Sequence, residues 1–246
     1  MSDTKIWLSS PHMGGGEQKY IQEAFDTNWI APLGPNVIGF ENDLEGYLKS
    51  DKKVAVLSSG TSALHLALVL AGVTHGDEVL CQSLTFSASA NPIVYQGATP
   101  IFIDSETTTW NLCPSALETT IQDRIAKGKK PKALIVVHLY GMPAKIDLIM
   151  SIAKKYEITV IEDAAEALGS TYKGQMCGTF GDFGILSFNG NKIITTSGGG
   201  ALVCKTKEMK EKIDHYIDNR SDILKGLELE RKAAAVFYQT LDYKGD

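Results

Sequence analysis

The sequence predicts a three-layer α/β fold, in which helices cover both faces of a mostly parallel sheet. Short apolar, β-branched runs alternate along the chain with longer segments whose apolar residues have helical spacing. Such regular alternation is typical of a parallel sheet, and polar and glycine residues gather where the expected strands end. The length of 246 residues is sufficient for a large core, and 43% hydrophobic with 22% charged residues is ordinary for a globular protein.

The amino-terminal part predicts two helices around an irregular loop. Apolar side chains recur at helical spacing in residues 17–25 and again in residues 37–48. Between them, NWIAPLGP at residues 28–35 has two prolines and a glycine, which exclude regular structure. Trp29 in this loop is either packed onto the domain or offered to a ligand or partner, and the sequence alone favours packing.

The rest of the chain up to about residue 190 supplies the sheet and its covering helices. The expected strands are residues 54–57, 78–81, 99–103, 133–138, 158–161 and 183–188. The expected helices are residues 64–71, 91–95, 114–126 and 146–155. Residues 127–132 form a basic loop that is typical of a solvated turn.

Residues 181–200 carry the most reactive candidate side chain. They read GDFGILSFNGNKIITTSGGG, an expected strand, a polar turn and a single lysine, Lys192. A lysine at such a junction is usually a solvated surface residue. Here Ser187 and Asn191 flank it, and three consecutive glycines allow the backbone to approach another group closely. A lysine held there could be desolvated, lose its proton and act as a nucleophilic amine.

Asp163 is the expected partner for this amine. It follows the apolar run ITVI, at the end of an expected parallel strand, where open α/β sheets bind ligands. In pyridoxal phosphate enzymes an aspartate pairs with the pyridinium nitrogen and keeps it protonated, so that the ring accepts electrons. Alone, Asp163 is more simply a helix cap or turn residue. Together with Lys192 it indicates pyridoxal 5'-phosphate as the cofactor.

A candidate phosphate site lies in SSGTSA, residues 58–63, between an expected strand and an expected helix. The unpaired N–H groups and the dipole of a helix N-terminus attract anions. The same motif also occurs as a simple tight cap. With pyridoxal phosphate as the expected cofactor, phosphate binding by Gly60, Thr61 and Ser62 is the better hypothesis.

Several segments in order resemble the DegT/StrS-type sugar aminotransferases of fold-type I. They are SSGTSALHLAL, VIEDAAEALGS, GTFGDFG and SFNGNKIITTSGGG. The amino-terminal SSPHMGGGEQKYIQEAF..NWIAPLGPNV is similar to the branch that aminates UDP-linked 4-keto-6-deoxy-N-acetylglucosamine on the way to bacillosamine-type sugars. The resemblance covers about residues 6–203. It implies a pyridoxal phosphate-binding large domain at residues 1–205, with an N-terminal substrate loop, and a helical tail at residues 206–246.

The resemblance also implies roles for individual residues. Lys192 holds the cofactor covalently and then moves protons, and Asp163 contacts the ring nitrogen. Phe86 matches an aromatic that stacks on the ring, although a phenylalanine more often packs in a core. Ser187 adds a hydroxyl to the phosphate site. Glu166 orients the cofactor or the substrate, unless it is a simple helix carboxylate on the same face as Asp163.

In the family the loop after the first helix lines the nucleotide-sugar site, which implies substrate contacts from Asn28, Trp29, Ile30 and Ala31. The implied reaction moves an amino group from an amino acid, with glutamate as the donor that the resemblance implies, to C4 of a UDP-linked 4-keto-6-deoxy-N-acetylhexosamine, for surface polysaccharide or glycan biosynthesis. A homodimer with shared active sites is implied too. The alternatives are a pyridoxal phosphate-dependent sugar dehydratase, which has histidine in place of Lys192, and a non-catalytic chain that binds the cofactor or a nucleotide sugar.

Beyond residue 203 the resemblance ends. Amphipathic patterns predict helices at residues 207–217 and 228–241. Family members carry a G-x-N-x-R segment that reaches the cofactor phosphate of the neighbouring subunit, followed by a smaller domain, and Asn219-Arg220 is at most a remnant of it. We therefore expect a fragment or a natural truncation, with the small domain absent and activity reduced or lost.

Composition excludes several other classes of protein. A net charge of −5 gives no electrostatic footprint for nucleic acid. The four cysteines are far apart and have no metal-ligand spacing, which indicates reduced thiols. Neither a signal peptide nor a long apolar run is seen, so a cytoplasmic protein without membrane contact is expected. His138, at a strand end, is more simply a buried, hydrogen-bonded histidine than a ligand or base.

Overall fold

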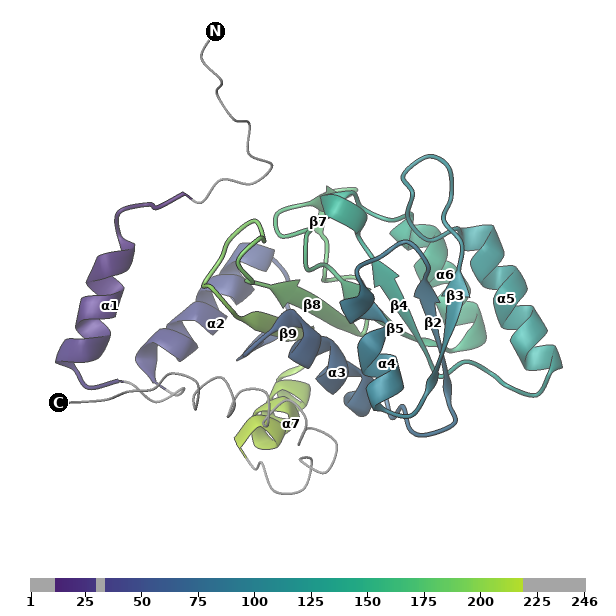
Figure 1. The fold of residues 1–246 in the computed structure, drawn as a ribbon, viewed down its shortest axis with the longest axis horizontal. Coiled ribbons are helices and arrows are strands. Elements are labelled where there is room, and N and C mark those ends of the chain that lie inside the picture. The colour runs from purple at the N-terminus through teal and green to yellow at the C-terminus, as the bar shows by residue number, and fades with distance from the viewer. Residues whose placement is uncertain (1–11, 30–33, 219–246) are drawn as a thin grey trace, which may run out of the picture.

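The computed structural model describes residues 12–29 and 34–218, and its centre is a seven-stranded sheet (Figure 1). The strands are β1 (Lys53–Leu57), β2 (Glu78–Gln82), β3 (Thr99–Ile103), β4 (Ala133–Val137), β5 (Thr159–Asp163), β8 (Phe183–Ser187) and β9 (Gly200–Cys204). Their order is β1-β9-β8-β5-β4-β2-β3. The run from β8 to β3 is parallel, and β9 is antiparallel to both β8 and β1. The predicted mostly parallel sheet is confirmed.

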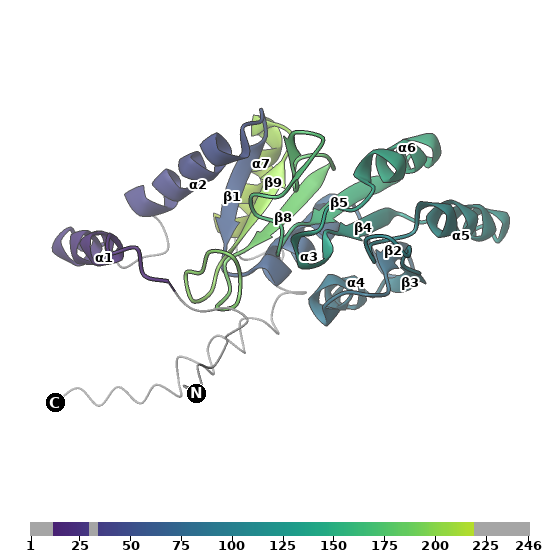
Figure 2. The same cartoon turned by 90° about the horizontal axis from the view of Figure 1, so that it is seen from above.

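Helices cover both faces of the sheet, which gives the predicted three layers (Figure 2). One face packs against α3 (Gly60–Leu70), α4 (Asn91–Tyr95) and α7 (Lys207–Asp218), and the other against α2 (Pro35–Leu48), α5 (Pro114–Ala126) and α6 (Ile146–Tyr156). Side chains alternate between the faces along each strand. In β4, for example, Ile135 belongs to the core under α3 and Leu134 to the core under α5 and α6.

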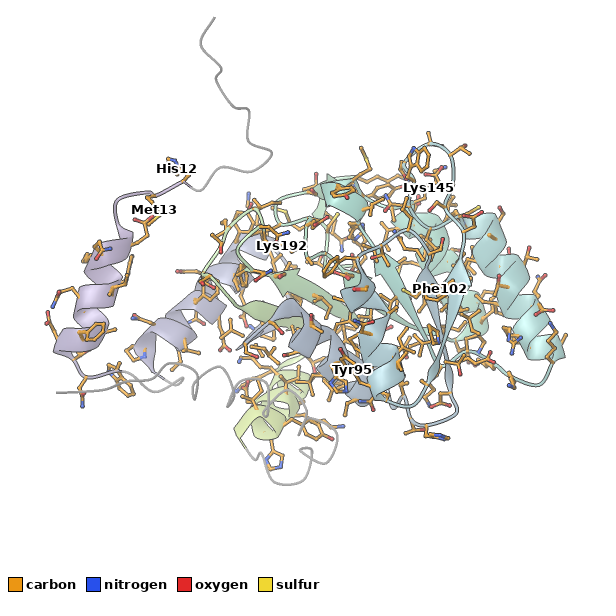
Figure 3. The ribbon with its side chains drawn as sticks, viewed as in Figure 1. His12, Met13, Tyr95, Phe102, Lys145 and Lys192 are labelled. Atoms are coloured by element: carbon orange, nitrogen blue, oxygen red, sulfur yellow. The ribbon has the colours of Figure 1, made fainter. Side chains whose placement is uncertain are left out.

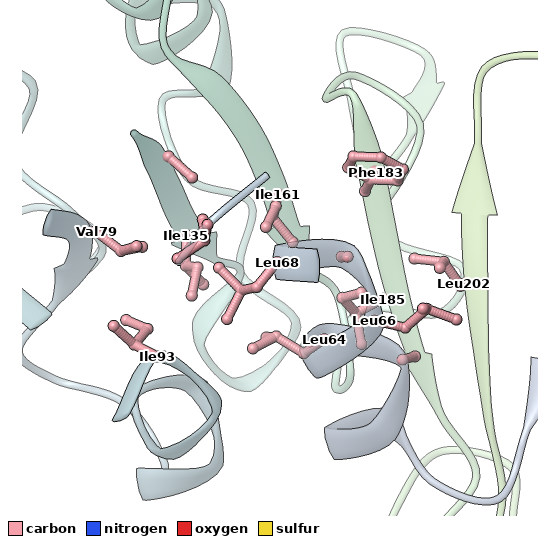
Figure 4. Packing of buried hydrophobic residues seen from close by; sticks show 14 of the residues in the cluster. Leu64, Leu66, Leu68, Val79, Ile93, Ile135, Ile161, Phe183, Ile185 and Leu202 are labelled. Carbon is pink, nitrogen blue, oxygen red and sulfur yellow. The ribbon is translucent and has the colours of Figure 1, made fainter. Parts of the chain in front are cut away.

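The core under α3 fixes that helix to the middle of the sheet. Leu64 and Leu68 of α3 lie over Ile135 and Ile161 of the parallel strands (Figure 4). Each of these side chains is at most 1% exposed. Full burial of one such side chain contributes about 1.5–3 kcal/mol, so the position of the α3 N-terminus is strongly determined by packing.

Four local features differ from the sequence-based expectation. Strand β9 was not expected, nor was the short hairpin of β6 (Thr171–Tyr172) and β7 (Gln175–Met176). Helix α3 begins at Gly60 rather than at Leu64, because Ser59 caps it. A turn rather than a helix follows Asp163. Short strands of this kind depend on neighbours that are distant in sequence.

The predicted amino-terminal helix is present as α1 (Glu17–Asp26), which stands apart from the sheet in Figures 1 and 2 and contains no buried residue. In the predicted tail, α7 buries Ile213 completely in the core under α3. The predicted helix at residues 228–241 and the pair Asn219-Arg220 lie outside the described residues. Within the described ranges, no helix is both long enough and apolar enough to cross a membrane.

Candidate active site

A cavity of about 380 Å³ lies at the carboxyl ends of the parallel strands. Its walls come from the ends of β4, β5 and β8, the N-terminus of α3 and the loop that follows β2. This is the edge at which open α/β sheets collect ligand-binding groups. The predicted cofactor residues that line it are Gly60, Thr61, Phe86, Asp163, Glu166, Ser187 and Lys192.

Lys192 enters the cavity from the loop between β8 and β9 (Figure 3). Phe188 closes the base of this loop, because its N–H donates to the carbonyl of Gly199 (2.9 Å) and its carbonyl accepts from the N–H of Thr196 (3.0 Å). Phe188 is itself buried in the core near α2. The Lys192 side chain is 13% exposed, and its Nζ atom lies 3.0 Å from Oε1 of Glu166. The lysine is thus held in the cavity wall rather than solvated.

The glycines after Lys192 serve a close approach between two backbone segments. A Cβ atom on Gly200 would lie 2.2 Å from the carbonyl carbon of Ser59, which no side chain could tolerate. Gly199 has a φ of 144°, which other residues rarely adopt. The predicted close approach therefore exists, but its target is the protein's own chain at the start of α3. It places the loop of Lys192 beside Gly60.

Asp163 is the last residue of β5 and is 8% exposed. Its Oδ2 atom accepts a hydrogen bond from the hydroxyl of Ser89 (2.7 Å), and its Oδ1 atom accepts from the N–H of Ala165 (3.2 Å). Burial raises the pKa of Asp163, whereas these two donors and the charge of Lys192 lower it. The protonation state of the buried Asp163 carboxyl therefore depends on these donors and on the charge of Lys192.

The N-terminus of α3 is capped in a way that leaves its first residues at the cavity. The Ser59 hydroxyl accepts from the N–H of Ser62 (3.0 Å), and the two hydroxyls are 2.8 Å apart. Ser62 thus contributes to the cap and does not line the cavity, whereas Gly60 and Thr61 do. The first N–H groups of a helix have no intrahelical acceptor. A Cβ on Gly60 would lie 3.0 Å from Cβ of Ser187, so glycine allows that hydroxyl to approach.

The loop after β2 supplies an aromatic side chain and a residue that the sequence did not indicate. Phe86 lines the cavity and is 76% exposed, so it does not pack in the core. Ser89, at the end of the short 3-10 turn Ser87–Ser89, is 1% exposed and donates to Asp163. Its hydroxyl lies 2.8 Å from that of Thr85. Ser89 and Asp163 are 74 positions apart, so no local pattern relates them.

His138 and Glu162 form a fully buried pair beside the cavity. Nε2 of His138 lies 3.0 Å from Oε2 of Glu162, and Nδ1 accepts from the N–H of Ala144 (3.1 Å). Because Nδ1 accepts a hydrogen bond, the proton of the neutral ring is on Nε2 and is donated to Glu162. Glu162 also accepts from the N–H of Gly178 (2.9 Å). The prediction of a buried, hydrogen-bonded histidine is confirmed, and Glu162 fixes the end of β5 next to Asp163.

The two described residues of the predicted substrate loop, Asn28 and Trp29, do not line this cavity. Asn28 is exposed with a φ of 59°, and Trp29 is 48% exposed. The indole ring lies against Gly34, where a Cβ atom would be 2.8 Å from Cε3 of Trp29. Neither residue lines the cavity of Lys192. Ile30 and Ala31 lie outside the described residues.

The donor set fits pyridoxal phosphate. The cofactor has an aldehyde for an amine, a ring nitrogen for a carboxylate, a phosphate for a helix N-terminus and a flat ring for an aromatic face. The cavity presents Lys192, Asp163, the start of α3 with Ser187, and Phe86 in one space. Sheet and cavity together define the class, which is the large domain of fold-type I pyridoxal phosphate-dependent transferases.

Within this class, the chain belongs to the DegT/DnrJ/EryC1/StrS aminotransferase family, whose match spans residues 11–223. It is 57% identical over 208 residues to the putative pyridoxal phosphate-dependent aminotransferase EpsN of Bacillus subtilis, covering 85% of this chain and 53% of EpsN. It is 42% identical to the GDP-perosamine synthase of Caulobacter vibrioides, covering 87% of this chain and 56% of the synthase.

The fold is similar to that of the putative sugar aminotransferase Spr1654 from Streptococcus pneumoniae, solved in its PLP-form. The TM-score is 0.77 at 30% sequence identity, with 89% of this chain and 58% of the other covered. The chain thus spans about half the length of the curated relatives it matches. At the level of the family, the predicted cofactor, pyridoxal phosphate, is confirmed.

Proposed function

We propose that this chain carries the cofactor and the catalytic lysine of a cytoplasmic nucleotide-sugar aminotransferase. The observation that carries the proposal is that one cavity holds Lys192, Asp163 and the N-terminus of α3. The amino donor is glutamate, and the acceptor is C4 of a UDP-linked 4-keto-6-deoxy-N-acetylhexosamine. The aminated sugar serves surface polysaccharide or glycan biosynthesis.

Each side chain has a defined task in this reaction. Bound pyridoxal phosphate supplies an electron sink for the pair released when the donor's Cα–H bond breaks. Lys192 would hold the cofactor covalently, and its amine would take the proton from the donor's Cα as a general base and return a proton as a general acid. Asp163 keeps the ring nitrogen protonated. Thr61 and Ser187 bind the phosphate, and Phe86 covers the ring.

The identity of residue 192 supports amination over dehydration. Among the sugar dehydratases that resemble this family, histidine stands in place of the lysine that holds the cofactor. Lysine at position 192 retains an amine that can both attach to the cofactor and carry a proton. Residue 192 therefore favours the aminotransferase over the dehydratase, whereas the sheet and the cavity suit both activities.

The choice of a UDP-linked acceptor rests on the amino-terminal segment, which is similar to the UDP-sugar branch. One relative, the GDP-perosamine synthase, is named for a GDP-linked product. Nucleotide choice is therefore a direct test of the finer proposal. A homodimer is proposed as well, with support from exposed aromatic residues near the cavity, Phe86 at 76% and Tyr140 at 84% exposed.

The test uses the purified 246-residue chain with pyridoxal phosphate and glutamate. We expect a new visible absorbance band that glutamate removes, with formation of pyridoxamine phosphate, and then slow amination of a UDP-4-keto sugar in preference to its GDP counterpart, because the chain spans only about half the length of its relatives. Lys192→Ala is the control. Equal cofactor attachment by the parent and Lys192→Ala would overturn the proposal, and preference for the GDP-linked sugar would overturn the choice of nucleotide.

A further inference from the structure

We infer that Ser89 is a positioning residue that sets the orientation and charge of Asp163, and that Thr85 and Ser89 tie the loop of Phe86 to that carboxylate. The inference rests on the proposed function, in which Asp163 contacts the ring nitrogen of the cofactor and Phe86 covers the face of the ring. The Ser89 hydroxyl lies 2.7 Å from Oδ2 of Asp163, and the Thr85 hydroxyl lies 2.8 Å from Oγ of Ser89.

The directions of these hydrogen bonds follow from the chemistry of the groups. An ionised carboxylate only accepts, so the Ser89 hydroxyl donates its single proton to Asp163. The Thr85 hydroxyl must then donate to the oxygen of Ser89. The chain of donation therefore runs from Thr85 through Ser89 to Asp163. Each hydrogen bond polarises the next one, which strengthens the final bond to the carboxylate.

Because Ser89 and Asp163 are buried, water cannot easily take the place of the Ser89 hydroxyl. Ser89 is 1% and Asp163 8% exposed, so water has little access to the carboxylate when the hydroxyl is removed. The second donor to Asp163 is the N–H of Ala165, at 3.2 Å on the other oxygen. Two donors on two oxygens fix the plane of the carboxylate, and the shorter bond comes from Ser89.

The same residue also holds the aromatic side chain of the site. The backbone N–H of Ser89 donates to the carbonyl of Phe86 (3.0 Å) and closes the turn on which Phe86 stands. Phe86 is 76% exposed, so packing in the core does not fix it. The position of Phe86 depends on the turn, and the hydrogen bond from Ser89 to Asp163 connects that turn to the end of β5. Ser89 therefore links Asp163, the residue for the ring nitrogen, to Phe86, the residue for the ring face.

The charges around Asp163 agree with this role. Burial raises the pKa of Asp163, and the Ser89 hydroxyl is the largest of the influences that lower it, ahead of the Ala165 N–H and the charge of Lys192. The buried thiol of Cys81 also faces the carboxylate and stays neutral, since burial and the charge of Asp163 raise its pKa to about 12. Without the hydroxyl, the neutral carboxyl is favoured, and a neutral carboxyl cannot keep the ring nitrogen protonated.

The first experiment needs no cofactor. The carboxyl carbon of Asp163 is followed by ¹³C NMR across pH in the parent chain, Ser89→Ala and Ser89→Cys, with the signal assigned by its loss in Asp163→Asn. We expect the pKa of Asp163 to rise in both Ser89 variants and to stay unchanged in Ser151→Ala, an exposed serine of α6. Cysteine has nearly the volume of serine but is a weak donor, so this variant retains the fold if alanine does not. An unchanged pKa in the folded Ser89 variants would overturn the inference.

The second experiment measures cofactor binding. Loss of a buried hydrogen bond to a charged group typically weakens binding about tenfold or more, so both Ser89 variants should bind pyridoxal phosphate about tenfold more weakly and with a shifted visible band. Thr85→Val should act in the same direction with a smaller effect. Ser187→Ala, at the phosphate end, should weaken binding without moving the band.

The two experiments separate the inference from the proposed function. If the parent chain binds no pyridoxal phosphate, the proposed function fails, while the NMR titration still decides the link between Ser89 and Asp163. If the parent binds the cofactor and the Ser89 variants match it in affinity and spectrum, the positioning role is wrong.

Discussion

The amine of Lys192 and the carboxylate of Glu166 form an ion pair of 3.0 Å in the cavity wall. Lys192 comes from the loop after β8 and Glu166 from the turn after β5, and these two strands are neighbours in the sheet. The pairing holds the Lys192 amine against Glu166 through a charge-assisted hydrogen bond. Lys192 must therefore leave Glu166 before it attaches to the cofactor.

Replacement of Glu166 by glutamine should accelerate attachment of pyridoxal phosphate severalfold, because a neutral amide holds the Lys192 amine less strongly than a carboxylate does. Stopped-flow absorbance measures the rate directly. Glu157→Gln is the matched control, since Glu157 pairs with Lys130 and is 87% exposed, away from the cavity. A rate equal to that of the parent would show that the ion pair does not limit attachment.

Borohydride reduction should attach the cofactor covalently to Lys192, and no other lysine should be labelled to a comparable extent. Lys192→Ala should lose nearly all of the label, as measured by mass spectrometry of peptides. Lys145→Ala provides the comparison, because Lys145 pairs with Glu106 at 2.7 Å and does not line the cavity. Equal labelling of the two variants would contradict the assignment of Lys192.

Asp163→Asn should make the cofactor-free chain more stable at pH 7, by about 1 kcal/mol or roughly 2–4 °C in Tm. Burial raises the pKa of Asp163 above its usual 3.8. The protonated carboxyl therefore stabilises the fold fully below pH 3.8, and this contribution is lost as pH rises through the folded-state pKa. The gain in Tm should thus be smaller near pH 4 than at pH 7. A gain in Tm that is independent of pH would contradict this account. The same variant should react with glutamate orders of magnitude more slowly than the parent.

Gly60→Ala should weaken binding of pyridoxal phosphate about tenfold while leaving the weaker binding of unphosphorylated pyridoxal nearly unchanged. The added Cβ meets Ser187 at 3.0 Å and moves its hydroxyl away from the start of α3. Absorbance titrations with both compounds measure the effect. Gly46→Ala is the control, because a Cβ there meets nothing within 4 Å. An equal loss for both compounds would place the phosphate elsewhere.

The sequence alone predicted the sheet and its covering helices, because strand and helix periodicities are local and the core is large enough to enforce them. It also indicated Lys192 and Asp163, because an amine and a carboxylate at expected strand ends belong to the same edge of a parallel sheet. Strand β9 escaped prediction, since its glycine start is explained only by the backbone of Ser59 beside it.

Local patterns determined the elements and the chemistry that the strand ends carry. The tertiary structure decided which groups meet, because contacts such as Ser89 with Asp163 join segments 74 positions apart. It also decided that Glu166 pairs with Lys192 and that Phe86 faces the cavity, whereas Asn28 and Trp29 do not. The physical reason is that periodicity specifies the face on which a side chain lies, while the partner across that face is set by the order and packing of the strands.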